Sequence, residues 1–207
     1  MELQCTICQR FHARICEKSP QKFQRNKPLT PQLSPHQWNR PQFGTRIQLT
    51  ATPDTSPKLD KKGTKDVQSI VGSFLYFGRA IDSTMLVALN EIAAYQSSPM
   101  QFISSKCNQL LDYVATFLNA KLHFTASNMI LHVDSDTAYL VQDRAHRRIA
   151  GHYILSSHPT LAPQIPHKTP NAPILVKCKT LQHVVALTAE AENGGGLFNN
   201  AQTILHV

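Results

Sequence analysis

The spacing of apolar residues divides the chain into a helical part followed by a part built from strands. Between residues 64 and 118 the apolar positions recur at intervals of three and four, which is the period of one helix face. They form three groups: Val67, Ile70, Val71, Phe74 and Leu75; Met85, Leu89, Ile92 and Ala93; and Ile103, Cys107, Leu110, Leu111, Val114, Phe117 and Leu118. Three such helices can pack on one another, so this part is interpreted as a structural bundle.

Polar residues indicate where these helices begin. Asp66 is expected in the first turn of the first helix, where the helix dipole favours a negative charge. Asp82 or Ser83 is expected to cap the second helix. Ser98 is expected to cap the third, with Pro99 at its first helical position.

After Ala120 the apolar residues alternate with polar ones, which is typical of strands. Leu122 and Phe124 predict a short strand. The next strand lies within residues 129–140 and is expected to be buried and to end in two carboxylates, Asp134 and Asp136. Because neighbouring side chains of a strand point to opposite faces, one face holds Ile130, His132, Asp134 and Asp136, and the other Leu131 and Val133.

Two more strands and a helix complete the predicted elements. The strands span residues 148–156 and 174–178, and a proline-rich loop separates them. Residues 181–206 predict a helix that is weakened by three glycines at 194–196, because each interior glycine costs about 1 kcal/mol relative to alanine. The predicted fold class is therefore α/β in the broad sense, more narrowly α+β.

The charge is concentrated at the N-terminus. Residues 1–65 hold 12 of the 21 basic residues and 4 of the 13 acidic ones, so the whole formal net charge of +8 lies there. Seven of the 13 prolines lie there too. A basic, proline-rich segment buries too little apolar surface to offset its loss of entropy, so residues 1–60 are expected to form a disordered tail or linker. This tail suits a polyanion such as nucleic acid, and a merely solvated tail is the alternative.

Composition also favours an intracellular protein, cytoplasmic or nuclear. No apolar run approaches the roughly 20 residues that a membrane span needs, and the N-terminus lacks the pattern of a secretory signal. The five cysteines are an odd number without the spacing of a disulfide scaffold, which indicates free thiols. No membrane partner is therefore expected, and the oligomeric state is left open.

Two further groups of residues carry possible chemistry. The first has the ligand types of a zinc knuckle, although two gaps are each one residue short: Cys5, Cys8, His12 and Cys16. Zinc could bind them tetrahedrally, or they are unpaired thiols in the tail. The second is basic and could contact phosphates in a salt-sensitive way, or it is a solvated connection between strands: Arg144, His146, Arg147 and Arg148.

Carboxylates near the strand end and in the last predicted helix suggest metal chemistry. Asp134 and Asp136 can be joined by Glu190 and Glu192, and such a set is what a divalent-metal phosphodiesterase needs. No acidic residue follows Glu192 in this sequence. Neither a glycine loop that would hold phosphates nor a Ser/His/Asp nucleophile pattern is present.

The chain from about His36 onwards resembles the C-terminal part of a copia-type retrotransposon polyprotein. The most specific segment is Val71-Gly-Ser-Phe-Leu-Tyr-Phe-Gly-Arg-Ala-Ile-Asp-Ser-Thr-Met-Leu-Val-Ala-Leu89. The others are Pro35-His-Gln-Trp38, Thr55-Ser-Pro-Lys-Leu-Asp60, Gln109-Leu-Leu-Asp-Tyr-Val-Ala-Thr116, Ser135-Asp-Thr-Ala-Tyr-Leu140, Ala150-Gly-His-Tyr153 and Ala189-Glu-Ala-Glu192.

The resemblance implies a helical connection region after a reverse transcriptase, over residues 61–120, and an incomplete ribonuclease H-like domain over residues 121–207. That domain would be a mixed sheet with a flanking helix, binding magnesium and an RNA–DNA hybrid. Asp136 best matches the family's first-strand aspartate and Asp134 is the alternative. Glu192 matches the helix glutamate, and Glu190 is the weaker candidate.

Two departures from the family pattern make hydrolysis by this chain unexpected. The strand and aspartate that should follow the helix are absent, and the triple glycine stands where the family is apolar and one residue shorter. The ancestral activity would be metal-dependent hydrolysis of RNA in RNA–DNA hybrids. The alternatives for this chain are a non-catalytic nucleic-acid-binding module and a non-functional relic.

Overall fold

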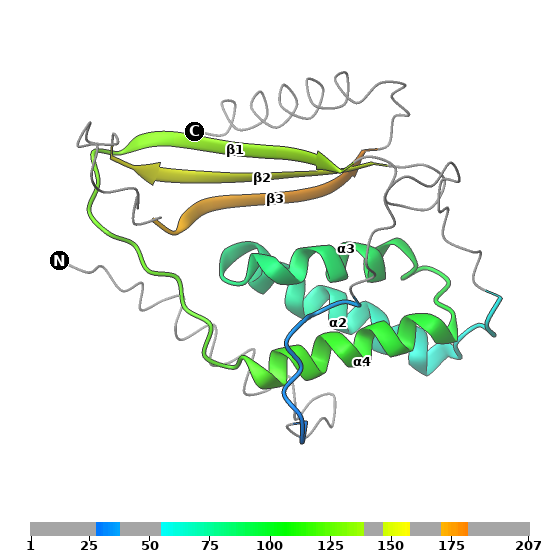
Figure 1. Cartoon of the computed structure of the whole chain (residues 1–207). Helices are drawn as coiled ribbons and strands as arrows, with labels where there is room; N and C mark the ends of the chain where they lie inside the picture. Colours follow the sequence, from blue (N-terminus) through cyan, green and yellow to red (C-terminus); the bar gives the residue numbers. More distant parts are fainter. Residues whose placement is uncertain (1–27, 38–54, 139–146, 158–170, 182–207) are drawn as a thin grey trace, which may run out of the picture. The chain divides into compact units, whose positions relative to one another are not determined.

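The computed structural model describes residues 28–37, 55–138, 147–157 and 171–181. Within these ranges the chain contains helices and an antiparallel sheet (Figure 1), so the α+β class is confirmed. The described residues fall into two compact units, a helical unit up to Ala120 and a sheet unit from Lys121 onwards. Each unit is considered by itself.

The first helix, α2 (Lys61–Ala80), begins at a local cap. The Oδ1 atom of Asp60 accepts a hydrogen bond from the backbone N–H of Gly63 at 2.7 Å, and the carbonyl of Asp60 accepts one from Thr64 at 2.9 Å. The helix therefore starts earlier than the apolar pattern indicates. The expectation that Asp66 lies in the first turn is wrong, because Asp60 is the N-cap and the helix begins at Lys61.

Replacing Asp60 by alanine is expected to lower the free energy of unfolding of the helical unit by about 1 kcal/mol, because the N–H of Gly63 loses its acceptor. Asp60→Asn keeps a side-chain oxygen and is the matched control, with a loss well below that of the alanine variant. Urea unfolding followed by far-UV circular dichroism measures both. Equal stability of the alanine variant and the unchanged chain would show that the cap contributes nothing.

The second helix begins at an acidic cap, as expected. Asp82 accepts a hydrogen bond from the backbone N–H of Thr84 at 3.2 Å and so caps the 3₁₀ turn η1 (Ser83–Met85) that leads into α3 (Leu86–Ala94). The other carboxylate oxygen, Oδ2, accepts a hydrogen bond from the hydroxyl of Tyr113 at 3.1 Å. Asp82 rather than Ser83 is thus the cap, and it also ties this turn to the third helix.

The third helix, α4 (Gln101–Thr116), starts two residues later than a proline in its first position would require, so the predicted Ser98–Pro99 start is wrong. Its first N–H groups are satisfied from a distant segment. Gln101 donates to the carbonyl of Pro57 at 2.9 Å, and Phe102 donates to Oγ of Ser56 at 3.2 Å. Helix N-terminal donors need partners, and here the partners come from the strand-like segment before α2.

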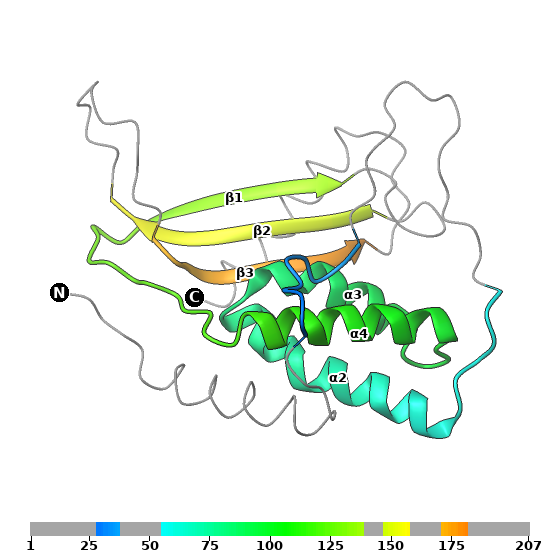
Figure 2. The same ribbon diagram turned by 60° about the horizontal axis from the view of Figure 1, so that its bottom comes forward.

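The three helices lie side by side (Figure 2), and their facing sides bury a shared apolar core. Phe74, Leu89 and Leu110 are fully buried, one from each helix, and they show how the predicted stripes meet. Phe117 and Leu118 lie beyond the end of α4 and are 40% and 36% exposed. The core consists of Val67, Ile70, Val71, Phe74, Phe77, Met85, Ala88, Leu89, Ile92, Ile103, Cys107, Leu110, Leu111, Tyr113 and Val114.

Part of the predicted tail packs on α4. In residues 28–37 the N–H of Gln32 donates to Oγ1 of Thr116 at 3.1 Å, the carbonyl of Ser34 accepts from the side chain of Gln109 at 3.2 Å, and Pro35 is buried. The rest of residues 1–54 lies outside the described ranges. Residues 28–37 are therefore part of the helical unit, not a solvated tail.

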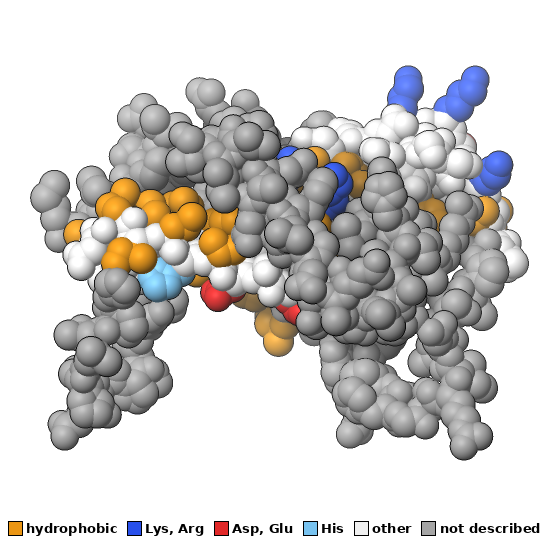
Figure 3. All heavy atoms as spheres, turned by 90° about the horizontal axis from the view of Figure 1, so that it is seen from above, with side chains coloured by type: hydrophobic (Ala, Val, Ile, Leu, Met, Phe, Trp, Pro, Cys, Tyr) orange, Lys and Arg blue, Asp and Glu red, His pale blue; other side chains and the backbone are white. Residues whose placement is uncertain are grey.

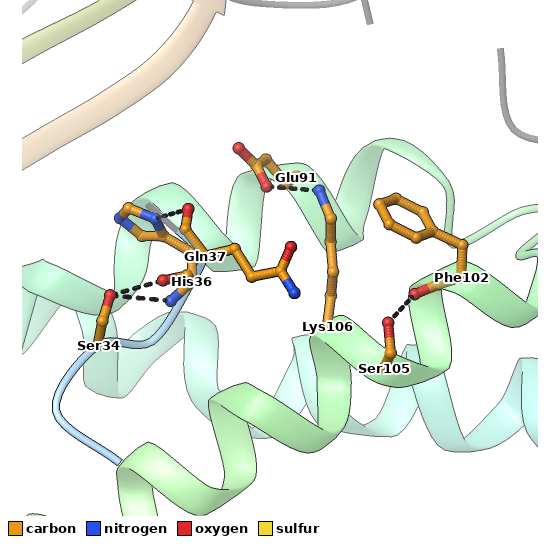
Figure 4. Close-up of polar contacts among 7 residues, drawn as sticks. All are labelled: Ser34, His36, Gln37, Glu91, Phe102, Ser105 and Lys106. Carbon is orange, nitrogen blue, oxygen red and sulfur yellow. Dashed lines mark hydrogen bonds and ion pairs between the residues drawn. The ribbon is translucent and has the colours of Figure 1, made fainter. Parts of the chain in front are cut away.

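A shallow polar groove of about 420 Å³ lies between this segment and α4. At its edge Nζ of Lys106 donates to Oε2 of Glu91 on α3 at 2.8 Å and lies 4.8 Å from the centre of the Phe102 ring (Figure 4). Both charged groups are partly exposed, so this ion pair contributes at most about 1 kcal/mol. It links α3 to α4 without dominating their packing.

The sheet unit contains three antiparallel strands in the order β1-β2-β3. They are β1 (Ile130–Ala138), β2 (Arg147–Ser156) and β3 (Pro173–Leu181), and the register shifts at Tyr153 and Ile154. The predicted strands at 148–156 and 174–178 are confirmed. Because β3 runs to Leu181, the predicted helix cannot begin at 181, and the rest of that helix lies outside the described residues.

The predicted strand at Leu122 and Phe124 is wrong, since residues 120–129 form no strand. A buried amide replaces the ladder there. Asn171 accepts a hydrogen bond from the N–H of Thr125 at 2.9 Å, and its Nδ2 donates to the carbonyls of Thr125 and Leu155 at 3.1 and 2.8 Å. The side chain of Asn171 therefore holds this segment against the end of β2. The alternation of apolar and polar residues cannot reveal such a contact.

The expectation that β1 is buried is also wrong. Among the described strands β1 pairs only with β2, so it lies at the edge of the described sheet. Leu131 and Val133 are 47% and 37% exposed. Alternation predicted the strand correctly, but burial depends on what covers each face, and alternation does not specify that.

A candidate metal and nucleic-acid site on the sheet

The two candidate first-strand carboxylates lie on one face of β1. Asp134 and Asp136 are two residues apart in a regular strand, so their side chains point the same way, and both are exposed. They lie in the C-terminal half of β1, which begins at Ile130. The strand therefore presents two acidic groups close together on an accessible surface.

The register of β1 and β2 gives these carboxylates their neighbours. Asp134 lies opposite His152, and Asp136 lies opposite Ala150. Directly opposed side chains of an antiparallel pair have Cβ atoms about 4.5–5.5 Å apart, so the carboxylate of Asp134 and the exposed imidazole of His152 are within reach of each other. In Figure 3, hydrophobic side chains on the described surface lie beside a histidine and acidic side chains.

Arg148 belongs to the same face. Arg148 pairs with Ala138 of β1. The next residue of β2 on the same face, Ala150, pairs with Asp136. Diagonal neighbours on a sheet face lie about 7–8 Å apart, within reach of a long side chain. Arg148, predicted as a phosphate contact, is thus brought to the carboxylate face.

The opposite face of the sheet carries two lysines of β3, together with the exposed apolar side chains Leu131 and Val133 of β1. Lys177 and Lys179 alternate on β3 and lie opposite Gly151 and Ile149 of β2. Nζ of Lys177 lies 5.6 Å from the centre of the buried Tyr153 ring. Burial lowers the pKa of Lys177, and the neighbouring charge of Lys179 lowers it further. The two faces therefore differ in charge, a feature that composition alone does not reveal.

Two buried polar atoms of the sheet lack hydrogen-bond partners among the described side chains, namely Nε2 of His132 and the hydroxyl of Tyr153. An unsatisfied buried polar atom costs about 1–3 kcal/mol. His132 shares a face with Asp134, whereas Tyr153 lies on the other face. Neither was singled out as a site residue from the sequence, because their isolation depends on the pairing register.

Several predicted site residues lie outside the described parts of the chain. Glu190 and Glu192, the helix carboxylates, are among them, as are Arg144 and the four possible zinc ligands Cys5, Cys8, His12 and Cys16. Arg147 is described only as backbone of β2. The structure thus brings together Asp134, Asp136 and Arg148 from the predicted set.

The donors on β1 fit magnesium in kind. Magnesium prefers oxygen ligands in octahedral geometry, and Asp134 and Asp136 supply carboxylate oxygens. Within the four described ranges no three side chains of His, Cys, Asp or Glu gather closely enough to hold a metal ion. The described carboxylates could therefore provide only part of a coordination shell.

The two described cysteines are free thiols in different settings. Cys107 is 4% exposed in the helical core, and burial raises its pKa to about 12. Cys178 on β3 is half-buried. A thiol that holds its proton so strongly is a poor nucleophile and metal ligand, so Cys107 is a core residue rather than a reactive one.

Comparison with known proteins identifies no relative: no family model, no curated protein and no solved structure matches the chain. No helix within the described residues combines the length and the apolar character that crossing a membrane requires.

Proposed function

We propose that this chain is a retrotransposon-derived segment from the reverse transcriptase and ribonuclease H region of a polyprotein. The observation that carries the proposal is the placement of Asp134 and Asp136 on one accessible face of β1, the first strand of an antiparallel β1-β2-β3 sheet that follows a helical unit. The ancestral activity is metal-dependent hydrolysis of RNA in RNA–DNA hybrids. The ribonuclease H-like fold, with a mixed sheet and a flanking helix, belongs to this proposal.

The residues have distinct roles in this proposal. Asp136, or Asp134 in its place, would hold magnesium together with Glu192 or Glu190, and bound magnesium would activate water and stabilise the leaving oxygen. Arg148, with Arg144 and Arg147, would contact phosphates of the hybrid. The exposed position of both aspartates on β1 lets a nucleic-acid backbone approach them.

Hydrolysis by this chain alone is not part of the proposal. Two carboxylates hold magnesium loosely, because the ion demands near-octahedral ligation and gives up its water reluctantly. We expect the purified chain to bind magnesium weakly at β1 and to leave an RNA–DNA hybrid uncut.

Magnesium titration followed by backbone NMR tests the site. Amide signals of residues 130–138 are expected to shift with magnesium, and the shift should disappear in Asp134→Asn/Asp136→Asn. Asp112→Asn, which removes a carboxylate from α4, is the matched control and should leave the shift intact. Absence of any magnesium-dependent shift on β1 would refute the site. Hybrid cleavage that is lost on Asp136→Asn would refute the expected lack of activity.

A non-catalytic nucleic-acid-binding module is the second candidate. It would use the basic residues of the N-terminal segment together with Arg144, Arg147 and Arg148, and the placement of Arg148 on the carboxylate face of the described sheet favours it. Such binding must weaken as salt rises, because it depends on the release of counterions from phosphates. Affinity for a hybrid that stays constant between low and high salt would exclude it. The third alternative, a relic without a stable fold, would show no cooperative melting.

A further inference from the structure

The exposed side of α2 forms a narrow line of residues with a distinctive composition. Its members are spaced by three or four positions, which places them one above another on a helix. All of them are exposed, and the core residues of α2, such as Phe74, are buried on the other side. The line, called the α2 line below, consists of Lys61, Lys65, Gln68, Gly72, Tyr76 and Arg79.

The cations of the α2 line are not neutralised within the described parts of the chain. No ion pair joins Lys61, Lys65 or Arg79 to an acidic side chain of the described residues. The carboxylate of Asp60 caps the helix, and Asp66 lies about a third of a turn away from the line. The line therefore presents positive charge to its surroundings.

The placement of Lys61, the first cation of the α2 line, works against helix stability. Lys61 and Lys62 occupy the first turn of α2, which contains no acidic residue. The helix dipole makes a cation there unfavourable by roughly 0.3–1 kcal/mol at most. A departure from a local stability rule is a common mark of a functional surface.

The middle of the α2 line is flat and is followed by an aromatic ring. A Cβ atom placed on Gly72 would meet no atom within 4 Å, so there is open space directly beside the helix backbone there. One turn further on, the side chain of Tyr76 is 61% exposed. The line thus offers cations at both ends, an open stretch between them and a ring face near one end.

We propose that the α2 line binds single-stranded nucleic acid. Lys61, Lys65 and Arg79 would contact phosphates along about 27 Å of helix, the strand would pass over Gly72, and a base would stack on Tyr76. Aromatic stacking combined with a cationic track is how proteins hold single strands without reading sequence. A membrane surface fits less well, because an interfacial helix inserts several apolar residues and this line has one aromatic ring.

This inference goes beyond the proposed function. The α2 line lies in the helical unit and needs neither metal nor the carboxylates of β1. Experiments can therefore disprove nucleic-acid binding at the α2 line while magnesium binding at β1 is upheld, or the reverse.

Fluorescence anisotropy with a labelled oligo-dT of about 20 nucleotides and the full chain tests the inference. In Lys61→Gln/Lys65→Gln/Arg79→Gln, affinity at low salt should fall at least about tenfold. The slope of log affinity against log salt should become shallower by about 2, since each phosphate contact on a single strand contributes about 0.7. A matched control, Lys121→Gln/Lys177→Gln/Lys179→Gln, removes the same charge from the sheet unit and should change neither quantity appreciably.

Tyr76→Ala separates stacking from charge. Affinity should fall roughly tenfold because a stacked base is lost, while the salt slope stays unchanged. A duplex of the same length should compete poorly. Asp134→Asn/Asp136→Asn, which disables the sheet site, should bind oligo-dT like the unchanged chain. Melting of every variant by circular dichroism establishes that it is folded.

The outcomes that overturn the inference are distinct. An unchanged salt slope in the α2 variant would place the phosphate contacts elsewhere. An equal loss of affinity in the sheet-unit control would show that binding depends only on the net charge of the chain. A loss of affinity in that control alone would show that the oligonucleotide binds the sheet. A duplex or an acidic peptide that competes as well as oligo-dT, or a Tyr76→Ala variant with full affinity, would exclude a single-strand site.

Discussion

Raising the pH from below 9 to above 12 is expected to lower the free energy of unfolding of the helical unit by about 4 kcal/mol through one thiol. Cys107 lies in the middle of α4 and is 4% exposed. Burial raises its pKa from 9.0 to about 12, because the thiolate would lose its hydration in the core. Each unit of difference in pKa corresponds to about 1.4 kcal/mol, which gives the expected size.

The direction follows from proton binding. Above pH 9 the thiol of the unfolded chain ionises, while the thiol of the folded chain keeps its proton up to about pH 12. The unfolded state then binds fewer protons than the folded state, so stability falls as pH rises through this window. Below pH 9 both states are protonated, and Cys107 adds no pH dependence.

Urea unfolding at a series of alkaline pH values measures the effect as a difference between variants. Cys107→Ala should be less stable at neutral pH because of the volume it loses, but its stability should fall much less between pH 9 and 12. Cys178→Ala, which removes a thiol from the sheet unit, is the control and should keep the full dependence. The same fall in Cys107→Ala as in the unchanged chain would show that this thiol is not responsible.

Tyr113 acts in the same direction at the upper end of the range. Burial is the main cause that raises its pKa above 10.0, its hydrogen bond with Thr84 acts the other way, and the charge and hydrogen bond of Asp82 raise it further. The folded state again holds the proton more tightly, so stability is lost above pH 10. Tyr113→Phe removes this contribution and leaves that of Cys107, which separates the two groups.

The helices were predictable from the sequence because their signal is local. Apolar residues three and four apart place Val67, Phe74 and Leu110 on core-facing sides whatever lies around them. Helix starts were less predictable. Asp82 caps from its own position, whereas the start of α4 depends on the carbonyl of Pro57 and the hydroxyl of Ser56, which lie more than 40 residues upstream. A local reading cannot see such partners.

The sheet shows the same division between local and distant causes. Alternation correctly placed Asp134 and Asp136 on one face of a strand, since that needs only the period of two. The partner of Asp134, His152, follows from the register of β1 and β2. The exposure of Leu131 depends on what covers its face of the sheet. The alternation of residues within β1 specifies neither the pairing register nor the covering of its faces.

Two glycines of α2, Gly72 and Gly78, differ in what surrounds them, although their local sequence signal is the same. Gly72 and Gly78 occupy the same helix and carry the same intrinsic cost of about 1 kcal/mol relative to a good helix former. A Cβ atom at Gly72 would meet nothing within 4 Å. At Gly78 it would lie 3.0 Å from Cδ1 of Leu89 and 3.2 Å from Cδ2 of Leu86, because α2 and α3 pack directly against each other there.

The same substitution at the two positions should therefore have opposite effects. Gly72→Leu is expected to raise the free energy of unfolding by somewhat less than 1 kcal/mol. Gly78→Leu is expected to lower it by about 3 kcal/mol, since the added side chain must displace Leu86 and Leu89 from a filled core. Urea unfolding of both variants, followed by far-UV circular dichroism, gives the difference. A Gly78→Leu variant as stable as Gly72→Leu would mean that α2 and α3 do not pack closely at this point, and the helical core would then have to be arranged differently.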